Sequence, residues 1–160
     1  KVINQFLADV DWGELDFLIA DLPPGTGDEI LTIAEEMKPD YAVIVTTLQE
    51  VSVIDAERAI NMARKLNIPL IGVVENMSGF VCPHCSAVVD IFGSGGGEKL
   101  ASDYDVQFLG SILIDIDARI LSDKGKPILL EKPNCEVSKT FKSISELIRA
   151  HFEQTLVKSY

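Results

Sequence analysis

The chain has 160 residues, of which 47% are hydrophobic, and a formal net charge of -11 at pH 7. This size and composition suit one globular domain over residues 1–160, and the acidic balance without a basic cluster argues against a nucleic-acid partner. No apolar run is long enough to cross a bilayer and the first residues lack the apolar core of a signal peptide, so we expect a cytoplasmic protein without a membrane partner.

Strand and helix signals alternate along the chain. The apolar residues 17–20 predict a strand buried on both faces, with Asp21 at its carboxyl end. Further strands are predicted at residues 41–47, 70–74 and 108–114, and helices at residues 1–11, 29–37, 51–66, 98–102, 118–122 and from Val137 to Phe152. The alternation predicts an α/β fold with a mainly parallel sheet flanked by helices.

The first chemical motif is Asp21-Leu-Pro-Pro-Gly25-Thr-Gly-Asp28. Ligands of open α/β sheets bind at the carboxyl ends of the strands, where an acid can hold Mg²⁺ against nucleotide phosphates. Gly25 and Gly27 allow backbone amides to face an anion. The same residues also suit an ordinary turn with a helix cap, and the sequence has no Gly-x-x-x-x-Gly-Lys-Ser/Thr loop. Asp21 could therefore supply the metal-binding part of a nucleotide site, but the sequence does not contain the phosphate-binding loop that would complete it.

The second chemical motif is Cys82-Pro-His-Cys85. Two thiolates at this spacing can bind one metal ion or part of a cluster, whereas a complete zinc or iron-sulfur site normally has four such ligands. A symmetric dimer would bring two pairs together. The alternative is a dithiol redox pair, although that motif normally opens the first helix after a first strand. We expect His84 to face solvent and Cys135 to be a lone thiol.

Six motifs occur in a specific order along nearly the whole chain. They are Trp12-Gly-Glu-Leu-Asp16, Asp21-Leu-Pro-Pro-Gly-Thr-Gly-Asp28, Thr46-Thr-Leu-Gln-Glu50, Glu75-Asn-Met-Ser78, Cys82-Pro-His-Cys85 and Phe92-Gly-Ser-Gly-Gly-Gly97. This combination resembles the Mrp/ApbC group of P-loop ATPases, which includes the eukaryotic cytosolic iron-sulfur scaffold proteins of the Nbp type. Relatives carry a Walker A loop well before the second motif. The chain therefore resembles the C-terminal portion of a P-loop NTPase domain of the MinD/Mrp type, without the N-terminal strand, P-loop and switch I.

The resemblance implies an ATP-binding iron-sulfur cluster carrier or scaffold. A homodimer would hold a bridging 4Fe-4S cluster through Cys82 and Cys85, with zinc as a metal that could take its place, and would transfer the cluster to apo iron-sulfur client proteins. ATP hydrolysis would belong to the longer parent, and we expect this chain alone to be inactive as an ATPase. The alternatives are a MinD/ParA-like positioning ATPase and a non-catalytic metal-binding dimer.

The resemblance also implies roles for single residues on the nucleotide side. The catalytic set would be Asp21, as a Walker B acid with Mg²⁺, together with Gly25, Thr26 and Gly27 of a switch II turn that starts at Pro24. ATP would be bound by Asp21, Pro24 and Gly25, by Asn76 at the adenine edge, and by a base-side loop with Asp115, Arg119 and Pro127.

Overall fold

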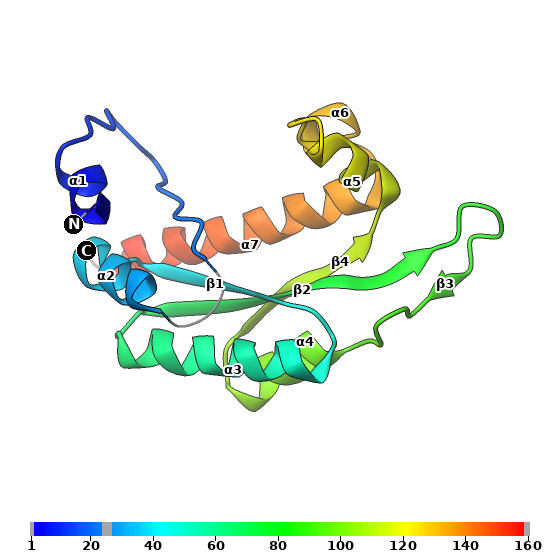
Figure 1. Cartoon of the computed structure of the whole chain (residues 1–160), viewed down its shortest axis with the longest axis horizontal. Coiled ribbons are helices and arrows are strands. Elements are labelled where there is room, and N and C mark those ends of the chain that lie inside the picture. The colour runs from blue at the N-terminus through cyan, green and yellow to red at the C-terminus, as the bar shows by residue number, and fades with distance from the viewer. Residues whose placement is uncertain (1, 24–26, 159–160) are drawn as a thin grey trace.

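A computed structural model describes residues 2–23 and 27–158 of the chain (Figure 1). In chain order, its elements are α1 (Val2–Ala8), α2 (Asp28–Met37), β1 (Tyr41–Thr46), α3 (Glu50–Lys65), β2 (Leu70–Val81), β3 (Val88–Val89), α4 (Gly96–Asp103), β4 (Gln107–Ile114), α5 (Ile116–Ser122), α6 (Ile128–Glu131) and α7 (Glu136–Lys158).

The sheet is centred on β2. Strands β1 and β4 both pair with β2 in parallel, and β3 pairs with its far end in antiparallel orientation. The parallel register places Thr46 of β1 and Ser111 of β4 on either side of Glu75 in β2. The carboxyl ends of the three parallel strands therefore meet at one edge of the sheet, as the predicted α/β fold requires.

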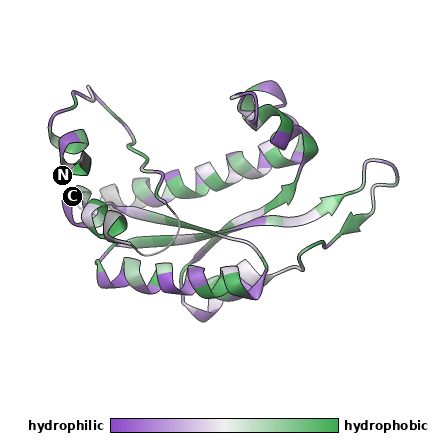
Figure 2. Cartoon of the chain, viewed as in Figure 1, coloured by the Kyte–Doolittle hydropathy of each residue, from purple (hydrophilic) through white to green (hydrophobic). Residues whose placement is uncertain are grey.

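Helices cover both faces of the sheet, so each face has its own hydrophobic core. The neighbouring β2 residues Val73 and Val74 point to opposite faces, because side chains alternate along a strand. Val73 packs with residues of α3 and α4, including the fully buried Ile60, whereas Val74 packs with α6 and α7. Burial of a side chain of this size contributes about 1.5–3 kcal/mol. Figure 2 shows hydrophobic residues along β1 and β4 between these helices.

Strand β4 contains one irregularity that orients its side chains. Val73 pairs with Phe108 and Val74 with Gly110, which leaves Leu109 as an extra residue in the ladder. Gly110 has φ +143°, a backbone conformation that favours glycine. The bulge lets Leu109 and Ile112 point into the same core although they lie three positions apart.

The predicted strand at residues 17–20 is wrong. This segment has no helix or strand in the structure, and the side chain of Ile19 is 88% exposed. Phe17 makes an edge-to-face contact with Phe152 of α7, with ring centroids 5.6 Å apart. A strand exists only through hydrogen bonds to a neighbouring strand, and no described strand pairs with this run. Asp21 therefore does not end a strand, and its side chain is exposed.

Other boundaries differ more locally. Helix α1 is shorter than predicted, whereas α4 and α5 begin two residues earlier, and α6 was not predicted from the sequence. Strand β2 continues past the predicted residues 70–74 to Val81 and forms a hairpin with β3. Among the residues that the structure describes, no helix is long and apolar enough to cross a membrane.

Candidate functional site

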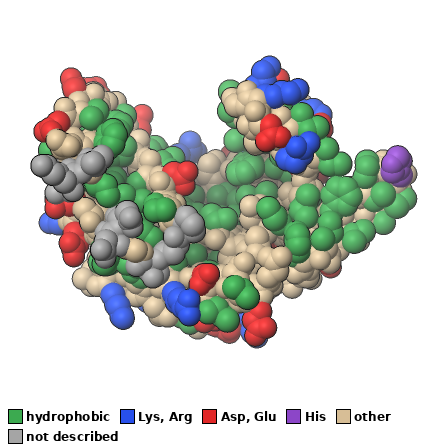
Figure 3. Space-filling model, in the orientation of Figure 1, with side chains coloured by type: hydrophobic (Ala, Val, Ile, Leu, Met, Phe, Trp, Pro, Cys, Tyr) green, Lys and Arg blue, Asp and Glu red, His purple; other side chains and the backbone are tan. Residues whose placement is uncertain are grey.

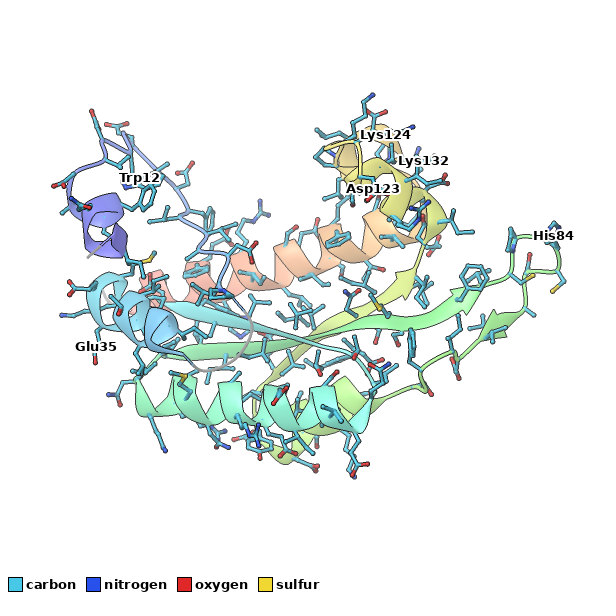
Figure 4. All side chains as sticks on the ribbon, viewed as in Figure 1. Trp12, Glu35, His84, Asp123, Lys124 and Lys132 are labelled. Carbon is cyan, nitrogen blue, oxygen red and sulfur yellow. The ribbon has the colours of Figure 1, made fainter. Side chains whose placement is uncertain are left out.

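The Cys82-Pro-His-Cys85 motif occupies the tip of the β2–β3 hairpin, which extends away from the helices (Figure 1). The backbone N–H of Cys82 donates to the carbonyl of Ala87 at 2.9 Å, and the N–H of Ser86 donates to the carbonyl of Cys82 at 2.9 Å. Ser86 has φ 57°, so the chain reverses within this short turn. Both cysteines therefore lie on one turn, and Figure 4 shows His84 at its outer end.

Backbone groups of this turn favour the thiolate form of Cys82. The backbone N–H groups of His84 and then Cys85, followed by the Cys85 side chain, lower the pKa of the Cys82 thiol below its ordinary value. A thiolate is the form that binds metals and iron-sulfur clusters. Cys82 is half-buried and Cys85 is exposed, so a ligand can reach both from solvent. The turn therefore suits soft-metal binding.

One copy of the chain supplies only part of such a site. Within residues 2–23 and 27–158, no group of three or more His, Cys, Asp or Glu side chains is placed to hold a metal ion. Cys135 lies on the separate segment that leads into α7, where its Sγ is 3.2 Å from the hydroxyl of Ser138. The hairpin thus offers two sulfur ligands out of the four that a zinc or cluster site normally needs.

Exposed apolar side chains flank the cysteine turn. They belong to Val81, Val88, Val89, Ile91 and Phe92. Figure 3 shows hydrophobic side chains along the whole hairpin up to the histidine at its tip. Val88 is 65% exposed although it lies in a strand. A cluster of apolar side chains of this kind marks a candidate surface for contact with another protein.

Two of the predicted base-side residues lie within β2 and directly after β4, toward the carboxyl edge of the sheet. Asn76 lies in β2 opposite Ile112 of β4, and its Oδ1 accepts from the N–H of Met77 at 2.9 Å. Asp115 follows β4 as the N-cap of α5, and its Oδ1 accepts from the N–H of Ala118 at 2.8 Å. Parallel pairing therefore brings the strand segments of Asn76 and Asp115 to the same edge.

The remaining base-side residues are farther along the α5–α6 segment. Arg119 is exposed and pairs with Asp123 of the same helix turn at 2.9 Å. Pro127 is exposed and is the N-cap residue of α6. Figure 4 shows this segment, with Asp123 and Lys132 labelled, on the opposite side of the sheet from α3. Both residues lie on the segment that continues from β4.

The predicted switch turn is only partly described. Gly27 is the N-cap residue of α2, with φ -76° and ψ 177°, and its carbonyl accepts from the N–H of Ile30 at 3.2 Å. Pro24, Gly25 and Thr26 lie outside the described residues. Asp21 is exposed in a segment without secondary structure. It therefore does not lie at the carboxyl end of a sheet strand, where the sequence pattern predicts it.

Glu75 has a structural role that the sequence reasoning missed. Its side chain is 1% exposed and accepts a hydrogen bond from the backbone N–H of Gly97 at 2.7 Å. In the sequence, Glu75 stands out only as the first residue of the Glu75-Asn-Met-Ser78 motif. Its burial could have been predicted from the sequence, because Glu75 directly follows the apolar strand residues 70–74.

Comparisons with known proteins agree on one family. The sequence profile described as ParA, NUBPL iron-transfer P-loop NTPase, matches residues 1–149. An iron-sulfur cluster carrier protein of Methanocaldococcus jannaschii is 58% identical over 147 residues, covering 91% of this chain and 50% of that protein. The cytosolic Fe-S cluster assembly factor CFD1 of Kluyveromyces lactis is 56% identical over 117 residues, covering 71% of this chain and 41% of that protein.

Solved structures show the same relationship. A nucleotide-binding protein of Archaeoglobus fulgidus, in complex with ADP, superposes with a TM-score of 0.70 and 46% identity over 78% of this chain and 51% of that one. The MinD cell division protein of Aquifex aeolicus superposes with a TM-score of 0.52 and 18% identity over 69% of this chain and 44% of that one, a likeness of fold alone. The chain spans about half the length of these curated iron-sulfur cluster carrier relatives.

Proposed function

This chain belongs to the family of NUBPL iron-transfer P-loop NTPases, and on that premise we propose that it is the cluster-holding part of an iron-sulfur cluster carrier. The observation that carries the proposal is the hairpin tip, where Cys82 and Cys85 share one exposed turn and backbone N–H groups favour the Cys82 thiolate. The cargo is an iron-sulfur cluster that the longer protein passes to apo iron-sulfur client proteins.

Two copies would hold one 4Fe-4S cluster. Each chain contributes Cys82 and Cys85, so a symmetric pair of hairpins supplies four thiolates around a two-fold axis. The exposed apolar side chains beside the turn, such as Val88, would then be covered in the homodimer. Zinc accepts the same tetrahedral set of four thiolates, so it could occupy the site in place of the cluster.

The proposal also covers ATP binding, by a longer parent protein that would carry the Walker A loop. ATP would be bound across the carboxyl edge of the sheet, with Asn76 at the base and Asp115, Arg119 and Pro127 in the adjoining loop. Asp21 would hold Mg²⁺, and residues 24–27 would form the switch that responds to the terminal phosphate. ATP hydrolysis would change how the cluster is held before transfer. The location of the protein would be cytoplasmic, as for the cytosolic assembly factor of Kluyveromyces lactis.

The test is anaerobic reconstitution with ferrous iron and sulfide, followed by iron and sulfide analysis, an absorption spectrum and the solution mass. We expect about four irons per two chains, which is the composition of one 4Fe-4S cluster shared between them. The variants Cys82→Ser and Cys85→Ser should each lose the cluster. Cys135→Ser is the matched control and should retain it, because Cys135 lies on a different segment from the hairpin.

The result that overturns the proposal is a cluster that remains after replacement of both hairpin cysteines, or no iron in the longer protein. A colourless protein that still binds and hydrolyses ATP would point to a positioning ATPase, whose chemistry needs no cysteine pair. Four irons that depend on the cysteines, without any nucleotide binding by the longer protein, would instead support a non-catalytic metal-binding dimer.

A further inference from the structure

A buried acidic side chain, that of Glu75, lies in the central strand β2 shortly before the cysteine hairpin. The carboxylate of Glu75 accepts hydrogen bonds from the hydroxyl of Ser78, from the backbone N–H of Gly97 at 2.7 Å, and from the hydroxyl of Ser111 at 3.4 Å. A buried carboxylate is costly unless donors compensate its charge, and these three groups do so. Because the three donors share one carboxylate, a shift of one donor alters the hydrogen bonds of the other two.

One of the donors marks the base of the hairpin. Regular pairing between β2 and β4 is interrupted between Asn76 and Phe80. Within this interval, Met77 has φ 58° and Gly79 has φ 92°. Ser78 lies between these two residues, so its hydrogen bond to Glu75 ties down the irregular point from which the hairpin departs. This contact joins the start of the hairpin to the side chain of Glu75.

The second donor belongs to the glycine-rich start of α4. The N-cap residue of α4 is Gly95, which has no side chain to accept hydrogen bonds from the N–H groups of the first turn. These N–H groups have no acceptor within the helix. Glu75 supplies an acceptor there through the N–H of Gly97. The adjacent Gly96 lies close to Leu48, in the loop between β1 and α3: a Cβ at Gly96 would be 3.3 Å from Leu48 Cδ2. That loop borders the carboxyl edge of the sheet.

We propose that Glu75 is a positioning residue that couples the cysteine hairpin to the carboxyl edge of the sheet. Its two carboxylate oxygens face different elements: Oε1 accepts from Ser78 and Ser111, and Oε2 accepts from Gly97. A displacement of the α4 start or of the neighbouring edge loop is transmitted through this carboxylate to the hairpin base. The structural link through Glu75 does not depend on the proposed function. Its consequence does rest on that function, since it states that nucleotide binding alters how the hairpin holds its cluster.

The first test needs neither metal nor nucleotide. Hydrogen–deuterium exchange of the metal-free protein is measured over hairpin residues 79–90 in the wild type, Ser78→Ala and Ser111→Ala. Both variants delete one hydroxyl donor to the same oxygen, but only Ser78 belongs to the hairpin base. We expect several-fold faster hairpin exchange in Ser78→Ala and unchanged exchange in Ser111→Ala, since local opening depends on local restraints. Equal hairpin exchange in all three proteins overturns the proposal.

A conservative variant tests whether the hydrogen bonds of this side chain, and not its negative charge, hold the hairpin. In Glu75→Gln, the amide oxygen can accept from Gly97 while its NH₂ group donates to the hydroxyls of Ser78 and Ser111, which also act as acceptors. Hairpin exchange should therefore stay near the wild-type rate in Glu75→Gln and increase in Glu75→Ala. Loss of protection limited to Glu75→Ala and Ser78→Ala supports the link, whereas wild-type exchange in Glu75→Ala overturns it.

The second test measures the coupling in the longer protein loaded with iron and sulfide. The rate at which a ferrous-iron chelator removes iron is compared with and without ATP. We expect Ser78→Ala to bind the same amount of iron but to lose the effect of ATP on this rate, and Ser111→Ala to retain it. The same ATP effect in Ser78→Ala as in the wild type, or no ATP effect in the wild type, overturns the coupling. Iron that stays bound after replacement of Cys82 and Cys85 refutes the proposed function, and the exchange experiment still decides the role of Glu75.

Discussion

The backbone N–H of Gly97 donates a 2.7 Å hydrogen bond to the carboxylate of Glu75, and a Cβ added at Gly97 would lie only 2.8 Å from the Cβ of Glu75. Side-chain carbons do not approach one another this closely, so only glycine permits the contact. Helix α4 consequently begins directly against strand β2. This close approach is what buries Glu75.

We predict that Gly97→Ala destabilises the protein by about 1–3 kcal/mol, because the added methyl group must displace backbone-linked atoms of Glu75. Urea unfolding followed by circular dichroism measures the loss. Gly96→Ala is the matched control in the same helical turn, because its new Cβ would meet the flexible end of Leu48 at 3.3 Å. Its stability should change much less. Equal losses in the two variants would contradict the packing argument.

Asp115 has a local role that can be separated from nucleotide binding. Its Oδ1 accepts from the N–H of Ala118 and caps α5. We predict that Asp115→Ala lowers the unfolding free energy by about 0.5–2 kcal/mol, whereas Asp115→Asn stays near the wild type because asparagine caps equally well. Thermal unfolding measures the difference. Asp117→Ala, which removes an exposed ion pair with Lys132, is the control and should cost about 1 kcal/mol or less.

Tyr41 should make the stability depend on alkaline pH. Burial raises the pKa of its phenol above the ordinary value of 10.0, and its hydroxyl donates to Gln107 at 2.9 Å. Because the folded state favours the neutral phenol, this stabilisation is complete below the ordinary pKa and is lost as the pH rises through the raised one. Absorbance titration should show one late tyrosine step that is absent in Tyr41→Phe and present in Tyr104→Phe. A late step that survives in Tyr41→Phe would refute the assignment.

Ser138 connects α6 to α7. Its side chain is fully buried, and its hydroxyl donates to the carbonyl of Lys132 at 2.7 Å. We predict that Ser138→Ala lowers the unfolding free energy by about 0.5–1.5 kcal/mol, because it removes the hydrogen bond that the buried Ser138 hydroxyl donates to this carbonyl. Chemical unfolding is the measurement. Ser145→Ala removes a hydroxyl of the same helix that is exposed and bonds within α7, so it should have little effect.

The hairpin surface should be needed for dimer formation. Val88 is 65% exposed beside the cysteine turn, and an aspartate there would place a charge in the proposed contact between two copies. We predict that Val88→Asp shifts the reconstituted longer protein from dimer to monomer in solution-mass measurements. Val51→Asp is the control, because Val51 is 73% exposed on α3, a different element from the hairpin. A dimer that persists in Val88→Asp would place the subunit contact elsewhere.

Several features of this protein follow from local sequence pattern alone. Alternating strand and helix signals predicted the parallel α/β fold, because periods of two and of 3.6 residues place apolar side chains on one face. Val73 and Ile60 accordingly lie in the predicted core. The spacing of Cys82 and Cys85 likewise brings both cysteines onto one turn, which suits either a pair of metal ligands or a dithiol redox pair.

Only the tertiary structure decided which segments become strands and which polar groups are buried. Residues 17–20 are as apolar as the strands, but they pair with no described strand and remain exposed. The cysteine segment became a hairpin because β2 continues to Val81 and pairs with β3. Glu75 is buried because Gly97 of α4 and Ser111 of β4 converge on it from elements distant in the chain. Pairing and burial are properties of contacts between distant segments, and a local sequence pattern does not specify the partner.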